Sequence, residues 1–248
     1  MPKLLSRFAQ RAITRTFSHM QPQVLLEGKK LSKRFGTHDV LNQLSLTVTA
    51  GERVALMGPS GAGKSTLLNC LGGIETPDQG EVLFAGTPLS ALDENGRARL
   101  RRGSIGTIFQ FFHLLPTLTV AENIELPLQL LRWPKARREA AVQKLLAEVG
   151  LEHRAHGKPD ELSGGEQQRT AIARALSPEP RLILADEPTG NLDSASGERI
   201  LDLLQTLSES HGFSLVMVTH QPETTRICDR VLHLLDGTIV HSSDPSVK

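Results

Sequence analysis

A glycine-rich segment between an apolar run and a helical pattern is the feature that most constrains how this chain folds. Residues 54–57 predict a short strand and residues 64–71 a helix directly behind the segment. The segment fits the pattern G-x-x-x-x-G-K-[ST], in which glycines let backbone N–H groups curl around an anion. It comprises Gly58, Pro59, Ser60, Gly61, Ala62, Gly63, Lys64 and Ser65, followed by Thr66. This context predicts a triphosphate-binding loop, and a glycine-rich turn without a ligand is the alternative.

A pair of adjacent acids supplies what such a loop still needs. The Lys64 ammonium and the Ser65 hydroxyl suit phosphate and Mg²⁺ respectively, but a metal also requires an acidic partner. Asp186 and Glu187 follow the apolar run 182–185, so they lie at the end of a predicted strand. Because successive strand residues point in opposite directions, Asp186 is predicted to face Mg²⁺ and Glu187 an attacking water. A solvated turn is the alternative for two adjacent acids.

A second anion-seeking helix end occurs about a hundred residues after the first. Its sequence is Leu162-Ser163-Gly164-Gly165-Glu166, in which Ser163 has the character of a helix N-cap. The two glycines allow close approach to the start of the predicted helix, whose N–H groups favour an anion. Since one phosphate loop already surrounds its phosphates, the second element is predicted to contact a nucleotide held by a partner chain.

Composition excludes several classes of protein. The 248 residues include 39% hydrophobic residues and two cysteines, which argues against disorder and against a disulfide-dense secreted scaffold. Apolar runs such as 182–185 and 215–218 are far shorter than the roughly 20 residues that cross a bilayer. A net charge of +1, with eight Phe, one Trp and no Tyr, makes nucleic acid an unexpected partner.

The N-terminal segment differs from the rest of the chain in charge. Residues 1–26 contain Lys3, Arg7, Arg11 and Arg15 and no acid, so the remaining residues carry a net charge of −3. We therefore separate a basic extension, residues 1–21, from a domain of residues 22–248. Three interpretations of the extension stay open: an amphipathic helix that docks on lipid or a partner, an organelle-targeting segment, or an unstructured tail.

The order of predicted elements indicates an α/β fold. Residues 24–48 have the alternation of strands with one wet face and predict an antiparallel lobe. Beyond them, strands and helices alternate, which predicts a mostly parallel sheet with helices on both faces. The predicted strands are 81–84, 105–109, 182–185 and 214–218, and the predicted helices are 93–102, 135–149 and 196–208. Residues 112–160 are mostly helical in pattern; Pro134 suits the first turn of the helix 135–149, and Gly150 suits the position just past its end. The helix 196–208 is predicted to bury one side, which carries Ile200, Leu203, Leu204 and Leu207. Asp236-Gly237 predicts a final hairpin.

In their order and spacing, these motifs resemble the ATP-binding cassette (ABC) ATPases. The resemblance runs from about residue 22 to the end and also includes Gln110, Asn191-Leu192-Asp193 and His220. It implies a P-loop NTPase (RecA-like) core with an N-terminal antiparallel β lobe and a helical subdomain at about 112–165. The stretches 57–69, 109–116 and 185–193 look most like the lipoprotein-releasing, macrolide-export and FtsE-like cell-division ATPases.

The resemblance also implies roles for single residues of the nucleotide site. Phe35 would stack on adenine where the family usually has Tyr, and packing within a strand is its alternative. Gln110 would contact Mg²⁺ and the attacking water and sense the γ-phosphate. Glu187 would act as general base, with His220 holding the water and Glu187 in place; an ordinary loop histidine is the alternative for His220.

Other implied roles concern the partner chain. Ser163, Gly164 and Gly165 would cap the γ-phosphate held by a second copy, and Asp193 would cross the same interface. ATP would thus close a head-to-tail homodimer, which hydrolysis would release.

At the level of the whole assembly, the resemblance implies a motor subunit at the cytoplasmic face of the inner membrane. It would drive separate integral membrane permease subunits through the surface 111–131, although packing between lobes is the alternative for that apolar segment. Export or release of a lipoprotein, peptide or hydrophobic compound is the expected work. An FtsE-like switch that signals across the membrane without moving a solute remains the alternative.

Overall fold

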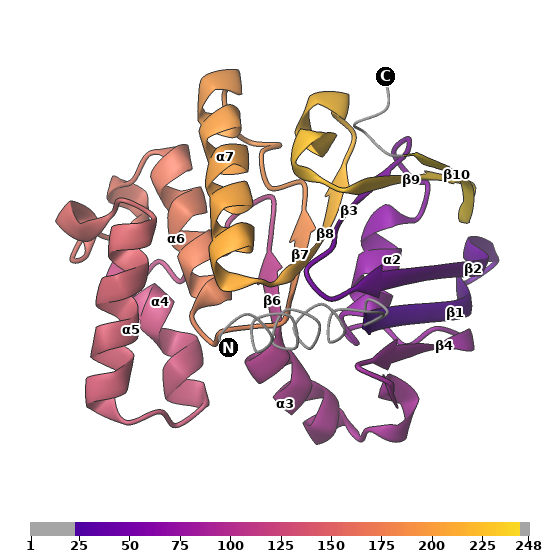
Figure 1. The fold of residues 1–248 in the computed structure, drawn as a ribbon, viewed down its shortest axis with the longest axis horizontal. Helices are drawn as coiled ribbons and strands as arrows, with labels where there is room; N and C mark the ends of the chain where they lie inside the picture. Colours follow the sequence, from indigo (N-terminus) through magenta and orange to yellow (C-terminus); the bar gives the residue numbers. More distant parts are fainter. Residues whose placement is uncertain (1–22, 244–248) are drawn as a thin grey trace, which may run out of the picture.

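Two sheets with helices around them make up the structure, a computed structural model that describes residues 23–243 (Figure 1). The basic extension predicted at 1–21 lies outside the described residues. The first sheet is antiparallel, as the sequence predicts, and its strands follow the order β2-β1-β4-β5. Its strands are β1 (Val24–Phe35), β2 (His38–Thr49), β4 (Gln79–Phe84) and β5 (Thr87–Pro88).

The second sheet of the described residues has six strands in the order β10-β9-β3-β8-β7-β6. Its strands are β3 (Arg53–Met57), β6 (Ile105–Ile108), β7 (Leu182–Asp186), β8 (Ser214–Thr219), β9 (Arg230–Leu235) and β10 (Thr238–Ser243). All neighbouring pairs are parallel except β9 with β10, which form the hairpin predicted at Asp236-Gly237. The expected mostly parallel sheet is therefore confirmed.

Helices cover both faces of this sheet (Figure 1). Longer helices are α2 (Lys64–Leu71), α3 (Glu94–Ser104), α4 (Val120–Leu130), α5 (Lys135–Glu148), α6 (Gly164–Leu176) and α7 (Ser194–His211). Short 3₁₀ helices are η1 (Leu89–Ala91), η2 (Glu152–Arg154), η3 (Pro159–Glu161) and η4 (Pro222–Ile227). Among residues 23–243, no helix combines the length and the apolar character that crossing a membrane requires.

The ends of α5 follow the predicted turn chemistry with a shift of one residue. Pro134 is the N-cap and not a first-turn residue, because its ψ of 144° is extended. Gly150 follows the helix with a φ of 65°, a left-handed conformation that glycine adopts without steric cost. The mostly helical stretch predicted at 112–160 contains α4 and α5, and α6 packs against α4.

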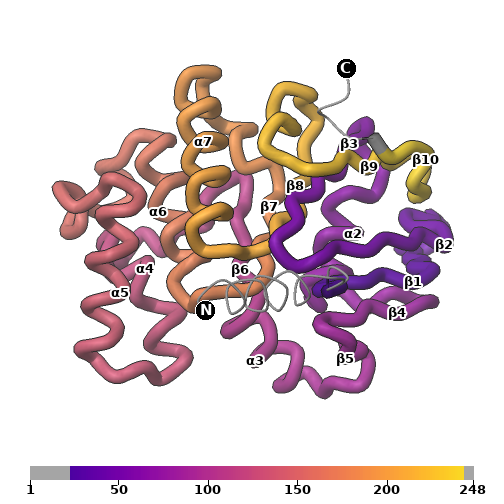
Figure 2. The backbone as a smooth tube through the Cα atoms, in the orientation of Figure 1, coloured from indigo at the N-terminus to yellow at the C-terminus, as the bar shows by residue number. Residues whose placement is uncertain are grey.

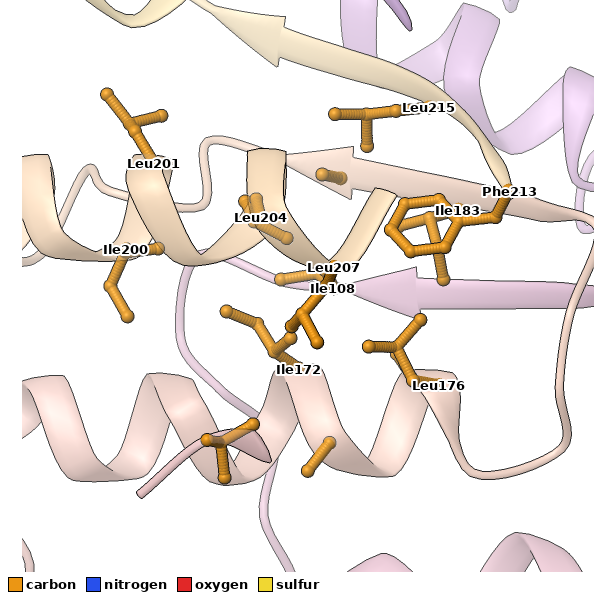
Figure 3. Packing of buried hydrophobic residues seen from close by; sticks show 14 of the residues in the cluster. Ile108, Ile172, Leu176, Ile183, Ile200, Leu201, Leu204, Leu207, Phe213 and Leu215 are labelled. Atoms are coloured by element: carbon orange, nitrogen blue, oxygen red, sulfur yellow. The ribbon is translucent and has the colours of Figure 1, made fainter. Parts of the chain in front are cut away.

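Alternate residues of the parallel strands enter two separate hydrophobic cores. On β7, Ile183 and Ala185 pack toward α6 and α7, whereas Leu182 and Leu184 pack toward α2 and the antiparallel sheet. Figure 3 shows the first core, where strand residues such as Ile183 face α6 and α7. Because side chains alternate along a strand, a strand buried on both faces must be apolar throughout. This accounts for the short, unbroken apolar runs in the sequence.

The buried face of α7 is displaced by about one residue from the predicted face. Ile200, Leu204 and Leu207 are buried as expected, but Leu201 is buried as well and Leu203 is only partly buried. Figure 3 shows Ile200, Leu201, Leu204 and Leu207 of α7 among the residues of this first core. Helical periodicity restricts the apolar face to a stripe, and the neighbouring elements select its centre.

Leu204→Ala should lower the free energy of unfolding by about 2–5 kcal/mol, because it leaves a cavity in the first core. Leu203→Ala, on the neighbouring position of the same helix, should cost about 1 kcal/mol, since that side chain is only partly buried. Urea denaturation followed by circular dichroism measures both. Equal losses for the two variants would contradict the observed orientation of α7.

Candidate functional site

Four adjacent parallel strands end at one edge of the central sheet. They lie side by side in the order β3, β8, β7, β6, although they come from distant parts of the chain. Figure 2 shows β3, from the first quarter of the chain, running beside β8 and β9 from its last fifth. Because the strands are parallel, the segments after them meet at their carboxyl ends. Those segments contain the glycine-rich loop, His220, Glu187 and Gln110.

The loop between β3 and α2 depends on glycine at two positions in particular. Gly61 and Gly63 have φ angles of 81° and 95°, in the left-handed region that favours glycine. A Cβ on Gly63 would also lie 2.6 Å from the carbonyl oxygen of Val40, so no side chain fits there. Gly63 precedes α2, whose first N–H groups therefore face the loop. The loop thus has the backbone geometry of an anion cradle.

Lys64 places its charge over this loop. The side chain is buried, and its Nζ donates hydrogen bonds of 2.8 Å to the carbonyl oxygens of Gly58 and Pro59. Within residues 23–243, no carboxylate forms an ion pair with Lys64. The hydrogen bonds of the ammonium thus go to carbonyl dipoles, and the charge of Asp186 acts on it only at longer range, which suits the ammonium to phosphate oxygens.

Ser65 and Asp186 form the polar pair expected of a magnesium site. The Ser65 hydroxyl donates to Oδ1 of Asp186 across 3.3 Å. Burial raises the pKa of Asp186, and the neighbouring Glu187 charge raises it further, while Ser65 and Lys64 act in the opposite direction. A partly desolvated carboxylate beside a hydroxyl is stabilised by a cation and supplies the oxygen ligands that Mg²⁺ prefers. The residues present therefore fit Mg²⁺.

Glu187 and His220 are in direct contact. The distance from His220 Nδ1 to Glu187 Oε1 is 2.9 Å. Glu187 has a φ of 45°, and its N–H donates to the carbonyl oxygen of Val218 on β8. The backbone thus turns sharply after β7, and the turn directs the carboxylate toward the residue that follows β8. A carboxylate oriented by histidine can accept a proton from water or hold water in position.

Gln110 is held beside Glu187 by Asn191, whose role the sequence did not indicate. Asn191 Nδ2 donates to the Gln110 carbonyl oxygen at 2.9 Å, and Gln110 Nε2 donates to Asn191 Oδ1 at 3.4 Å. A Cβ on Gly190 would lie 2.9 Å from Gln110 Nε2 and 3.2 Å from Glu187 Oε2. The two side chains therefore converge on a glycine that leaves them room. The position of Asn191 inside a family motif was the only signal in the sequence.

A cleft of about 680 Å³ brings many of the predicted residues together. Its lining consists of His38, Val40, Ser60, Gly61, Gly63, Lys64, Ser65, Thr66, Glu187 and His220. His38 and Val40, at the start of β2, were missed because neither residue belongs to a recognisable chemical pattern. Phe35, at the end of β1, is 49% exposed, with Lys33 Nζ 5.2 Å from the centre of its ring. The ring is thus available for stacking.

Residues 162–166 and Asp193 do not line this cleft but form a second polar surface. Asp193 caps α7 through a 3.0 Å hydrogen bond from the Ser196 N–H. Hydrogen bonding by the Ser196 side chain, followed by that of its N–H, lowers the pKa of Asp193. A Cβ on Gly165 would lie 3.8 Å from the Ser196 hydroxyl oxygen, so the starts of α6 and α7 are neighbours. Leu162 is buried in the first hydrophobic core and anchors the segment.

A reciprocal capping box fixes the start of α6. Ser163 Oγ accepts from the Glu166 N–H, and the Glu166 carboxylate accepts from both the N–H and the hydroxyl of Ser163. Arg154 adds a 3.0 Å ion pair to Glu166. These contacts, led by the Ser163 N–H, lower the pKa of Glu166 to about 2. The predicted N-cap is confirmed, and the cap holds the glycines in a defined position.

Comparisons with known proteins agree with this geometry. Residues 41–190 match the ABC transporter family, and this match covers more than half of the chain. The chain belongs to the ABC transporter ATP-binding family. As a member, it binds and hydrolyses ATP and serves as the motor subunit of a transporter.

Relatives in this ABC family match almost over their full length. One is the lipoprotein-releasing system ATP-binding protein LolD of Syntrophotalea carbinolica, 47% identical over 87% of this chain and 96% of the relative. The LolD of Pseudomonas fluorescens is 51% identical over 81% of this chain and 88% of the relative. A solved dimeric structure of the ATP-binding cassette MJ0796, in a post-hydrolysis state with ADP and Pi, is 39% identical with a TM-score of 0.81. It covers 89% of this chain and 99% of the MJ0796 chain.

Glu166→Gln should lower the free energy of unfolding by about 1–2 kcal/mol at pH 7, because the neutral amide weakens the cap and the pair with Arg154. Because folding lowers the pKa of Glu166, its charged form stabilises the folded state at pH values above the ordinary pKa of 4.5. That stabilisation is lost as the pH falls toward the folded-state pKa of about 2. The difference between wild type and variant should therefore shrink between pH 5 and pH 2, as measured by urea titrations at several pH values. Exposed Glu152, changed to Gln, is the matched control. A difference independent of pH would contradict the assignment.

Proposed function

We propose that this ABC cassette hydrolyses ATP at the interface of a head-to-tail homodimer that drives separate membrane subunits. One observation carries the proposal: within residues 23–243, the helices α2 and α6 both start at glycines in a way that suits an anion, and of these two starts only that of α2 lines the nucleotide cleft. A second copy facing the first in opposite orientation would place residues 163–165 against ATP held by the loop 58–65. Two equivalent composite sites would then form.

Within one half-site, the observed contacts support a division of roles. The loop amides and Lys64 would hold the phosphates, and Phe35 would stack on the adenine. Ser65, Asp186 and Gln110 would hold Mg²⁺, which neutralises charge on the phosphates when bound. Glu187 would take a proton from the attacking water or orient it, and His220 would hold that carboxylate through its 2.9 Å contact.

The other half-site would come from the partner's capped helix. The hydroxyl of Ser163 and the N–H groups at the start of α6 would face the γ-phosphate, and Gly164 and Gly165 would permit close backbone approach. Asp193 is adjacent and would cross the same interface. The dimeric form of MJ0796, which is 39% identical to this chain, supports the arrangement. ATP would favour the closed dimer because its γ-phosphate adds contacts that ADP lacks.

Glu187→Gln should bind ATP with nearly unchanged affinity, lose at least about 100-fold in turnover, and accumulate as a dimer in ATP. Sedimentation velocity with and without ATP measures the dimer, and phosphate release measures turnover. Lys64→Ala should remain a monomer because it cannot hold the nucleotide. Glu223→Gln, an exposed acid on η4, is the matched control and should behave as wild type. A Glu187→Gln protein that stays monomeric in saturating ATP would refute the proposed dimer.

We further propose that this cassette lies at the cytoplasmic face of the inner membrane, that its membrane subunits dock beside the edge strand β6, and that the complex releases lipoproteins. A cleft of about 340 Å³ lies there, with Phe109, Leu126 and Leu130 among its lining residues. Phe111 is 68% exposed, which supports the sequence-based choice of 111–131 as a docking surface. The LolD relatives support lipoproteins as the substrate.

In proteoliposomes that contain the membrane subunits of a lipoprotein-releasing system and a labelled lipoprotein, wild-type chain and ATP should release the label. Glu187→Gln should leave it bound, because release requires turnover. Flotation of the vesicles separates bound from released lipoprotein. Vesicle-stimulated ATP turnover without any release would favour the FtsE-like alternative, in which the motor signals and moves no solute.

A further inference from the structure

The turn that follows Gln110 has an unusual backbone. Phe112 and His113 have φ angles of 59° and 48°, so two successive aromatic residues are in the left-handed region. This conformation is disfavoured for each of these residues, since Cβ crowds the carbonyl oxygen. Bulky residues persist there only when surrounding contacts hold them. The turn therefore requires an external anchor.

Arg174, in the last turn of α6, is that anchor. Its Nη2 donates to the carbonyl oxygen of Phe112 at 2.8 Å, and its Nη1 donates to that of His113. No carboxylate within the described range 23–243 pairs with this guanidinium, and burial lowers its pKa. A rigid, planar guanidinium that donates from its two terminal nitrogens to two consecutive carbonyl groups fixes the conformation of the turn. Buried charges that only stabilise a fold are normally paired with an opposite charge, and Arg174 instead donates to backbone carbonyl groups.

On its other side, Gln110 is fixed to the segment after β7. Asn191 binds its backbone carbonyl at 2.9 Å, as described above. The ring of Phe109 lies 4.6 Å from that of His113, centre to centre, which closes the turn around Gln110. The position of Gln110 thus depends on two anchors, one after β7 and one on α6.

The same helix carries the partner-facing glycines at its other end. Arg174 lies eleven residues after Ser163, or about 16 Å along α6. Phe112 lies near both ends of α6: its carbonyl oxygen accepts from Arg174, and a Cβ added to Gly164 would lie 3.9 Å from its ring. One rigid helix therefore contacts the turn after Gln110 and also begins at the capped segment 163–166 (Figure 1).

We propose that Arg174 is a positioning residue for Gln110, through which movement of α6 adjusts Gln110. This rests on the proposed function, in which residues 163–165 meet the second copy's ATP. When they do so, any shift of α6 is passed through Arg174 to the turn 111–113 and on to Gln110 of the same chain. Each composite site thereby influences the opposite one, because α6 belongs to one site and Gln110 to the other.

The test is Arg174→Met in a double-mutant cycle with Gln110→Ala, measured as ATP turnover and as nucleotide binding by the isolated cassette. Arg174→Met should lower kcat by about 10- to 100-fold, since small misplacements near the reacting atoms have effects of this size. Affinity for ATP should stay within about two-fold. In the Gln110→Ala background the same change should lower kcat by less than about two-fold, because a residue that acts through Gln110 has nothing left to position.

Control variants separate positioning from folding. Arg174→Lys keeps the charge but not the fork, so it should fold and lose about three- to ten-fold in kcat. Arg99→Met, an exposed arginine of α3, should behave as wild type. Losses that multiply in the double variant, or a parallel loss of ATP affinity, would overturn the proposal. If Glu187→Gln forms the ATP-bound dimer while both Arg174 variants turn over ATP normally, this inference fails and the proposed function stands. If Glu187→Gln stays a monomer in ATP, the proposed function itself fails.

Discussion

Parallel pairing of β3, β8, β7 and β6 is the constraint on which the rest of the structure depends. It places four loops at one sheet edge, and with them Lys64, His220, Glu187 and Gln110. The pairing requires strands buried on both faces, which the two hydrophobic cores provide. The order of the strands in the sheet therefore sets the positions of the loops and of the catalytic side chains on them.

Charges at the site are balanced by dipoles and single contacts more than by ion pairs. Lys64 lies against two carbonyl oxygens, and Asp186 is a partly desolvated carboxylate beside a hydroxyl. Bound phosphate and Mg²⁺ would stabilise Lys64 and Asp186 respectively, because each group would gain an opposite charge in a region of low dielectric. The start of α6 differs from these two groups. The Glu166 carboxylate already accepts hydrogen bonds from the N–H and the hydroxyl of Ser163, so the conformation of this segment is fixed without a partner chain.

Much of the fold was accessible from the sequence because its signals are local. Helix α2 begins and ends at the predicted residues, and the hairpin at Asp236-Gly237 is confirmed. The glycine-rich loop and the Ser163 cap depend on backbone rules within a few residues. The face of α7 was less accurate, since Leu201 and not Leu203 is fully buried. Periodicity restricts that face to a stripe, and only the position of the sheet selects its centre.

The sequence by itself thus determined the phosphate loop, the acid pair after β7, the capped helix α6 and the family. Tertiary structure alone decided which distant groups meet. Asn191 holds Gln110, and Arg174 holds the turn after it from 62 residues away along the chain. No local sequence pattern indicates such a role for Asn191 or Arg174. Both donate to backbone carbonyl groups, and because every residue has one, the residue that accepts the hydrogen bond leaves no signal in the sequence. For Arg174, the packing of α6 against β6 determines which carbonyl groups come within reach.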